Sequence, residues 1–174
     1  WRRISALKPS NRRFRRPIFA SLCWHMADIV SPDVRSRMMA GIRGKDTKPE
    51  LIVRRALHAR GFRYRLHARD LPGKPDLVFP KFRAVILVHG CFWHGHECHL
   101  FRWPRSRVEF WQEKISKNRN NDLVNAQKLA EAGWRRAIVW ECALKGKRRM
   151  PVDTFTDQLE DWLHSGLSGI EIVA

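Results

Sequence analysis

Residues 88–99, VHGCFWHGHECH, are rich in potential metal ligands and also contain a Phe-Trp pair. Cys91, His96 and Cys98 follow the spacing C-x4-H-x-C directly after a β-branched run, and Cys142 ends a later predicted strand. Two adjacent strands of one sheet would bring Cys142 to this loop, and thiolates with an imidazole are the ligands that structural zinc prefers. The segment therefore predicts a Cys3His site for Zn²⁺. Reduced, buried cysteines that merely lie near histidines are the alternative.

A zinc site does not explain the other polar residues of this region. His89 and His94 are candidate general bases, because a rigid loop can hold an imidazole whose pKa lies near neutrality; a solvated bystander is the alternative. Asp76 stands at the start of one predicted strand and His89 at the end of the next. A carboxylate on such a hairpin can hold Mg²⁺ in a metal-dependent nuclease. The usual E-x-K companion is absent, since residues 83–86 read RAVI.

Periodicity and turn residues predict an α/β chain. Ser31-Pro32 and two capping boxes, Thr47–Glu50 and Ser106–Glu109, mark helix starts, while Gly61 and Gly133 mark helix ends. Runs that alternate or are β-branched, bounded by turn residues, predict strands, the second and third of which form a hairpin. We expect helices over residues 31–42, 47–61, 106–133 and 153–164, and strands over 62–67, 76–79, 83–90 and 134–142.

Charge narrows the class of partner. Lys+Arg 34 against Asp+Glu 17 gives a net charge of +17, which attracts polyanions. Nucleic acid is the leading partner, and a ribosomal or merely solvated basic surface is the alternative. No run of about 18 apolar residues occurs, so we expect no membrane span. Cysteines among histidines without a secretory signal favour metal ligation in a reducing cytoplasm over disulfides.

The length of 174 residues predicts one folded domain. Residues 1–25 are basic, contain no acidic side chain and precede Met26, which resembles a natural start. We expect residues 1–25 to be a disordered or non-native extension and residues 26–174 to be a single domain. An Arg-rich DNA-binding arm or a transit peptide is the alternative for the extension.

Three longer stretches carry a family resemblance: LPGKPDLVFPKFRAVILVHGCFWHGHECHLFRWP, RVEFWQEKISKN and GWRRAIVWECAL. From Met26 to about Lys147 the chain resembles the very-short-patch repair (Vsr) endonuclease family, which also departs from E-x-K. The resemblance implies a restriction-endonuclease-like core with a central mixed β-sheet flanked by helices and a structural zinc site. It also implies a monomeric, Mg²⁺-dependent enzyme of the prokaryotic nucleoid and cytoplasm. The enzyme would nick double-stranded DNA 5′ of the T in T:G mismatches left by 5-methylcytosine deamination, linked to a cytosine-5 methyltransferase and other mismatch repair proteins.

The same resemblance assigns catalytic roles. Asp76 would hold Mg²⁺ together with the main-chain carbonyl of Val88, and His94 would be the general base, with His89 beside it. Glu50 would organise water near the metal, and Asp122 would orient a histidine. As plain sequence, Glu50 is already explained by its capping box and Asp76 by a strand that follows a turn.

DNA contacts follow from the resemblance as well. Phe92, Trp93 and Trp111 would wedge between base pairs at the mismatch, where stacking on an aromatic ring offsets the cost of unstacking. The other predicted contacts are Lys114 and Asn118 with the mispair and Met39 from the minor groove. Trp111 and Met39 could instead fill the core, and Lys114 could be a solvated charge. Two other functions stay open: a zinc-stapled, non-catalytic DNA-binding module, and a restriction-type nuclease of other specificity.

Overall fold

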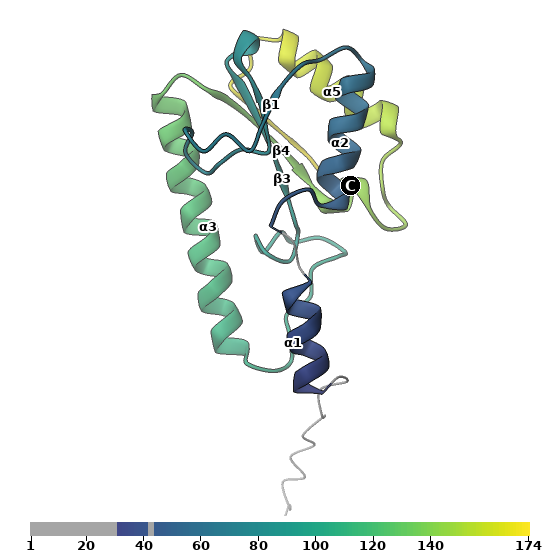
Figure 1. Cartoon of the computed structure of the whole chain (residues 1–174), viewed down its shortest axis with the longest axis vertical. Coiled ribbons are helices and arrows are strands. Elements are labelled where there is room, and N and C mark those ends of the chain that lie inside the picture. The colour runs from purple at the N-terminus through teal and green to yellow at the C-terminus, as the bar shows by residue number, and fades with distance from the viewer. Residues whose placement is uncertain (1–30, 42–43) are drawn as a thin grey trace, which may run out of the picture.

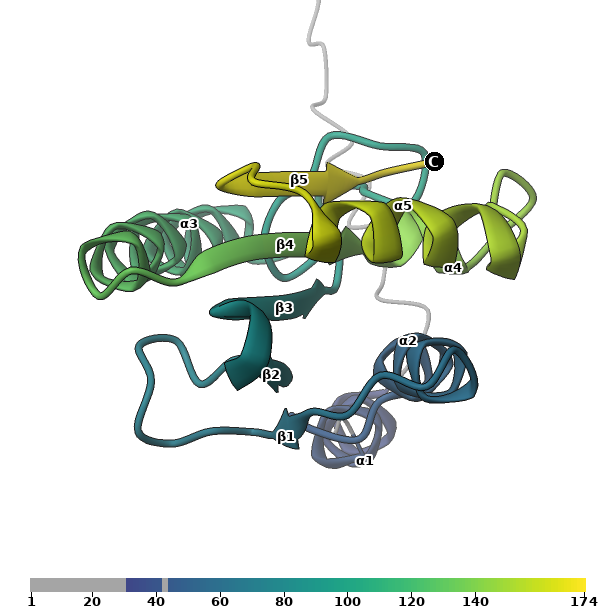
Figure 2. The same ribbon diagram turned by 90° about the horizontal axis from the view of Figure 1, so that it is seen from above.

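A computed structural model describes residues 31–41 and 44–174. The predicted extension, residues 1–25, and the predicted start at Met26 lie outside the described residues. The described part builds one mixed sheet in the order β1-β2-β3-β4-β5, antiparallel from β1 to β3 and parallel from β3 to β5 (Figure 2). The strands are β1 Arg65–Leu66, β2 Leu77–Phe79, β3 Ala84–His89, β4 Arg135–Trp140 and β5 Gly169–Ile172. The predicted α/β class, with a mixed sheet and flanking helices, is confirmed.

Helices cover both faces of the sheet (Figures 1 and 2). They are α1 Pro32–Ala40, α2 Lys48–Ala59, the 3-10 turn η1 Pro80–Phe82, α3 Val108–Glu131, α4 Glu141–Leu144 and α5 Val152–His164. On one face, Leu57 of α2 and Trp162 of α5 pack with Ile86 in the larger core. On the other face, Leu129 of α3 packs with Val85 in a smaller core. Within the described residues, no helix is both long and apolar enough to cross a membrane.

The central strands β3 and β4 position the loop that is rich in potential metal ligands. Both strands are largely buried, as β-branched runs covered on two faces should be. Their parallel register pairs Val88 with Val139 and His89 with Trp140, so the two strands end at the same edge. The loop that begins at Gly90 therefore leaves the sheet beside the start of α4.

Two of the three predicted helix starts are confirmed. The Ser31 hydroxyl accepts the Val34 N–H at 3.3 Å, and the Thr47 hydroxyl accepts the Glu50 N–H at 3.4 Å. The third was wrong, because α3 is preceded by Arg107 in a left-handed conformation (φ 51°) and no side chain among the described residues caps it. The Arg107 guanidinium instead lies 4.3 Å from the centre of the Phe110 ring. That packing replaces the predicted Ser106 cap.

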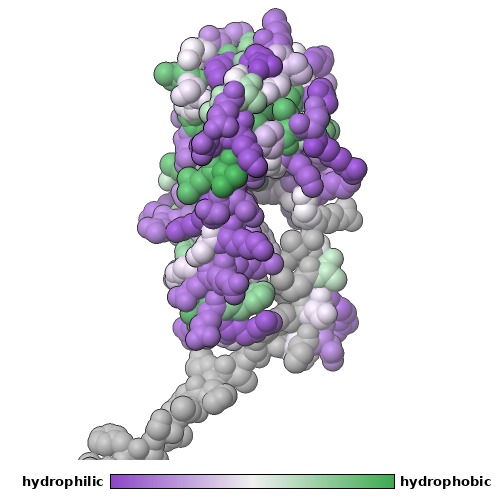
Figure 3. All heavy atoms as spheres, turned by 90° about the vertical axis from the view of Figure 1, so that its left-hand side faces the viewer, coloured by the Kyte–Doolittle hydropathy of each residue, from purple (hydrophilic) through white to green (hydrophobic). Residues whose placement is uncertain are grey.

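Two strand predictions need correction. The predicted strand 62–67 is reduced to β1, because the Phe62 N–H bonds to the Leu57 carbonyl and its ring packs into the larger core. Cys142 does not end a strand: β4 ends at Trp140, and Cys142 is the second residue of α4. The short elements α4 and β5 were not predicted. Figure 3, which faces α3, shows a mostly hydrophilic surface with scattered hydrophobic patches.

Candidate active site and metal centre

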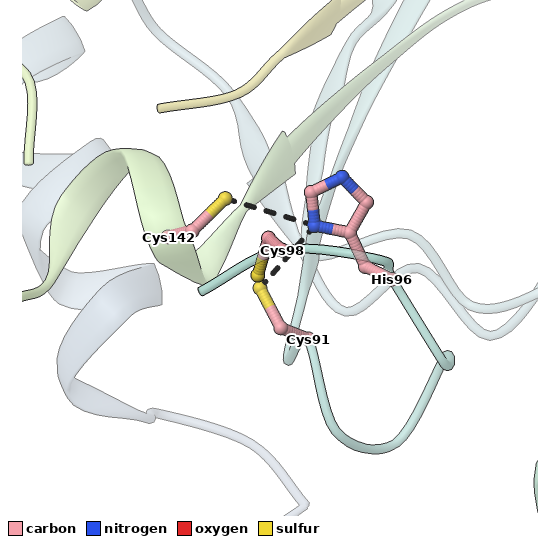
Figure 4. Close-up of side chains that lie close together, drawn as sticks. All are labelled: Cys91, His96, Cys98 and Cys142. Carbon is pink, nitrogen blue, oxygen red and sulfur yellow. Dashed lines mark hydrogen bonds between the residues drawn. The ribbon is translucent and has the colours of Figure 1, made fainter. Parts of the chain in front are cut away.

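The four predicted zinc ligands lie together, and we call them the cysteine cluster. Figure 4 shows Cys91, His96 and Cys98 from the loop converging with Cys142 from α4. The Nδ1 atom of His96 lies 3.6 Å from the Cys91 sulfur and 3.7 Å from the Cys142 sulfur. All four ligand atoms lie within 4.8 Å of one another.

This arrangement fits a tetrahedral metal ion. With Zn–S bonds of about 2.3 Å and Zn–N bonds of about 2.0 Å, neighbouring ligands of one zinc stand about 3.6 Å apart. Burial and the neighbouring Cys98 thiol raise the pKa of Cys91 far above its ordinary value, and burial also raises the pKa of Cys142, so these two thiols would stay protonated without a cation. Burial lowers the pKa of His96, which favours the neutral imidazole that binds metals. The cluster could therefore hold a structural metal ion.

The loop that carries the cluster is fastened to α3. Arg119 donates hydrogen bonds to the carbonyl oxygens of His94 and Gly95, and Asn118 donates to the Trp93 carbonyl at 2.9 Å. Gly95 has a φ of 61°, and a Cβ there would stand 2.6 Å from the Ile115 side chain. Glycine is required at this position because the loop turns in the left-handed region against α3.

A cavity of about 680 Å³ opens beside this loop and collects the predicted catalytic residues. We call it the active-site cavity. Residues from five separate segments of the chain line it, and they include Glu50, Asp76, Val88, His89, Trp93, His94, Lys114 and Asp122.

Asp76 and Val88 face one another across the hairpin. The Val88 N–H donates to the Asp76 Oδ2 atom at 2.7 Å. In an extended strand, the N–H and C=O of one residue point to the same side, so the Val88 carbonyl also faces Asp76. The pKa of Asp76 is raised to about 6, chiefly by burial and partly by the charge of Glu50, while the hydrogen bond from the Val88 N–H lowers it. A carboxylate and a carbonyl that converge in this way are suitable ligands for a hard cation such as Mg²⁺.

Glu50 belongs to a network that the sequence did not predict. Its Oε1 accepts from the Thr47 hydroxyl at 2.9 Å, and its Oε2 accepts from the Asp46 N–H at 2.9 Å and from Arg54 at 2.8 Å. Arg54 also lies 2.7 Å from the Nε2 atom of His67. The Thr47 hydroxyl caps the Glu50 N–H as predicted, but the Glu50 carboxylate accepts from the Asp46 N–H rather than from the Thr47 N–H of a capping box. The carboxylate is held rigidly at the edge of the cavity.

His67 completes the contacts between this network and Asp76. The His67 Nδ1 atom lies 4.0 Å from the Asp76 Oδ1 atom, and its Nε2 lies 3.4 Å from Asp46. Asp46, Glu50 and His67 together could also hold a cation. Sequence reasoning missed Asp46, Arg54 and His67 because their proximity depends on how α2 docks beside β1; only the i,i+4 pair Glu50–Arg54 had a local pattern.

His89 and His94 form a stacked pair, with ring centres 3.8 Å apart and planes within 7°. The Nδ1 atom of His94 lies 2.5 Å from the Asp122 Oδ2 atom on α3. Burial lowers the pKa of His89 to about 3, and the charges of His94 and Arg136 act in the same direction. His89 is therefore neutral at pH 7. Its Nδ1 atom is buried and has no hydrogen-bond partner among the described residues.

The predicted wedge residues also lie together, and we call them the aromatic cluster. Phe92 contacts Trp93 and Trp111 edge to face, with ring centres 5.3 Å and 5.1 Å apart. All three side chains are half-buried, and the Lys114 ammonium lies 5.9 Å from the Trp93 ring. Asn118 is engaged by the Trp93 carbonyl. Met39 lies on α1, but its side chain is outside the part of the chain that the structure describes.

Trp140 connects the cysteine cluster with the histidine pair, and its role was not predicted. Its ring stacks on His96 at 4.1 Å and meets His89 edge to face at 5.3 Å. Its indole N–H donates to Glu171 of β5 at 3.1 Å. The sequence could not predict this contact because β5 itself was not recognised.

Known proteins resemble this chain closely. A family model described as "DNA mismatch endonuclease Vsr" matches residues 27–100. The chain is 44% identical to the DNA mismatch endonuclease Vsr of Escherichia coli K12 over 138 residues, which cover 79% of this chain and 88% of the relative. It is 50% identical to the type II nicking enzyme V.XorIIP of Xanthomonas oryzae over 119 residues, covering 68% and 88%. The type II nicking enzyme V.NmeAIP of Neisseria meningitidis is 45% identical over 122 residues, covering 70% and 87%.

Proposed function

Because this chain belongs to the Vsr family of DNA endonucleases, we propose that it nicks double-stranded DNA on the 5′ side of the mispaired T in T:G mismatches. The observation that carries the proposal is the active-site cavity, where Asp76, the Val88 backbone and the stacked histidine pair meet beside Trp93. Family membership favours the enzyme over the non-catalytic binding module. The restriction-endonuclease-like core, the monomeric state and the functional link to a methyltransferase are parts of the same proposal.

The proton chemistry rests on His94. An ionised carboxylate only accepts hydrogen bonds, so Asp122 keeps the proton of His94 on Nδ1 and leaves Nε2 as the acceptor. Nε2 can then take the proton from the attacking water. The neutral His89 stacks on this ring and fixes its plane without adding a competing charge.

Asp76 and the Val88 carbonyl would hold Mg²⁺, with Glu50 ordering water nearby. When bound there, the ion would neutralise the negative charge that builds up on the scissile phosphate. The chain itself contributes rigidity: Arg54 fixes Glu50, and the Val88 N–H fixes the Asp76 carboxylate. The products would carry a 5′ phosphate and a 3′ hydroxyl.

Mismatch recognition would rest on the aromatic cluster. A mispaired step unstacks at a lower cost than a paired one, so rings inserted there select the mismatch as well as grip it. Lys114, Asn118 and Met39 would contact the mispair, and a Zn²⁺ ion in the cysteine cluster would hold the loop in place.

The experiment is a nicking assay on a matched pair of labelled duplexes. One carries a single T:G mispair in a C-T-(A/T)-G-G context and the other is fully paired, and both are incubated with Mg²⁺. The proposal expects a nick 5′ of the T in the mispaired duplex alone. Relatives named as type II nicking enzymes leave room for another specificity. Cleavage of both duplexes would support that alternative.

A further inference from the structure

A second surface near the cysteine cluster carries positive charge and an exposed aromatic ring. It is a groove of about 740 Å³, lined among others by Phe101, Arg102, Trp103, Arg105 and Arg148. We call it the arginine groove. None of the residues that line it also lines the active-site cavity. The groove is therefore a separate surface.

The side chains of this groove are available to a ligand. Arg102, Arg105 and Arg148 are exposed, and within residues 31–41 and 44–174 no side chain forms a hydrogen bond or ion pair with any of them. A fourth arginine, Arg119, is already engaged by the loop carbonyls and by Glu97, the one carboxylate among the described lining residues. Three uncompensated guanidiniums in one groove would attract an anion that extends over several charges.

Trp103 is the second feature that points to a ligand. It is 47% exposed, although a tryptophan ring normally gains by burial. Its ring meets Phe101 edge to face at 5.1 Å, and Phe101 lies 6.3 Å from Phe92 of the aromatic cluster. A continuous row of rings thus leads from the aromatic cluster to the arginine groove.

We propose that the arginine groove binds the sugar–phosphate backbone of the duplex flank that leads away from the mismatch. The arginines pair with phosphates, while Trp103 packs on a deoxyribose between them and offers its indole N–H to a phosphate oxygen. This inference extends the proposed function, because it assumes that one duplex occupies both the aromatic cluster and the groove. The arginine groove would increase the affinity for the duplex and fix the position of the protein along it, while the aromatic cluster selects the mispaired bases.

The test measures DNA binding without Mg²⁺ on three duplexes that carry the T:G mispair. One is about three helical turns long with the mispair at its centre, and the others are cut to about half a turn on one side or the other. On the long duplex, Arg105→Ala/Arg148→Ala should make the negative slope of log K against log salt shallower by about 2, since each phosphate contact contributes about 0.9 to its magnitude. The difference should vanish on one of the two shortened duplexes.

Matched variants separate the groove from general charge and from folding. Arg55→Ala removes an exposed guanidinium on α2, on the other face of the sheet, and should leave the contrast between duplexes unchanged. Trp103→Ala should weaken binding about fivefold on the long duplex, and Trp103→Phe should restore most of it. Zinc content and melting temperature should match the wild type for every variant, because these side chains are exposed.

Two results would overturn the proposal. One is an unchanged salt slope on the long duplex for Arg105→Ala/Arg148→Ala. The other is an equal loss on all three duplexes, which would mean that the groove only supports the aromatic cluster. Failure of the T:G proposal looks different: a fully paired duplex of the same length would then bind as tightly as the mispaired one, while the groove variants would still weaken both.

Discussion

The cysteine cluster and the active-site cavity meet within one loop, and their side chains are satisfied in different ways. In the cluster, four soft ligands stand at distances that suit one metal ion. In the cavity, burial raises the pKa of Asp76, and the His89 Nδ1 atom is buried without a partner among the described residues. The cysteine cluster can be stabilised by a single metal ion. The active-site cavity instead keeps a buried carboxyl group and a buried imidazole nitrogen, both of which cost folding free energy.

Loss of a cluster ligand should have the largest effect of any single change. We expect Cys142→Ala to abolish zinc binding and to lower the free energy of unfolding by more than about 5 kcal/mol. The reason is that the free energy of metal binding at such a site adds to the stability of the fold. Metal analysis and thermal unfolding would check this. Retention of zinc and an unchanged melting temperature would remove the structural role that we give the cluster.

Asp122→Asn tests whether the cavity depends on the tautomer of His94. The amide cannot hold the Nδ1 proton as a carboxylate does, so we expect the nicking rate to fall by about 10-fold to 100-fold while DNA affinity is unchanged. Asp161→Asn on α5, an exposed carboxylate on the opposite face of the sheet, is the matched control. A wild-type rate for Asp122→Asn would show that the 2.5 Å contact does not serve proton transfer.

Asp76→Asn should make the Mg²⁺-free protein more stable. The pKa of Asp76 is about 6 in the folded protein against an ordinary 3.8. Its negative charge therefore leaves the free energy of unfolding unchanged below pH 3.8 and lowers it by the full amount above pH 6. Since one pKa unit corresponds to about 1.4 kcal/mol, we expect a gain of about 3 kcal/mol at pH 8 and none at pH 3.5. Urea unfolding at both pH values would measure it. A loss of stability at pH 8 would mean that burial of the charged Asp76 carboxylate does not destabilise the fold.

Asn118→Ala should have the smallest effect, because it removes one hydrogen bond between α3 and the loop. We expect the preference for mispaired over paired DNA to fall about fivefold, which corresponds to about 1 kcal/mol for one bond. Asn121→Ala, an exposed asparagine on the same helix, is the control. Competition binding with the two duplexes would detect the change, and equal preferences in Asn118→Ala and wild type would indicate that other contacts fix the loop.

The sequence predicted the cysteine cluster better than it predicted the cavity. Three cluster ligands lie within eight residues, and the β-branched runs that bring Cys142 beside them are strong local patterns. The contacts of His67 with Arg54 and Asp76 have no such pattern, because they depend on the docking of α2 and β1. Ligand chemistry is local, whereas the cavity is assembled by tertiary packing.

The same distinction explains the errors in the fold. The predicted start of α3 was wrong because packing of Arg107 on Phe110 overrides the capping propensity of Ser106. The strand β5 was missed because residues 169–172 are few and follow a Ser/Gly-rich stretch, and they become a strand only by pairing with β4. Long, strongly patterned elements such as β3 and α3 were found. Short elements whose stability comes from their neighbours were not.

The most direct test of the account is single-turnover nicking of the T:G duplex by the wild type, Asp76→Ala and His94→Ala. Binding and zinc content would be measured alongside. The account predicts that both variants bind the duplex and retain zinc but nick at least about 100-fold more slowly, because each lacks a group that acts on the reacting phosphate or water. A nick by either variant at close to the wild-type rate would contradict the claim that the active-site cavity performs the reaction.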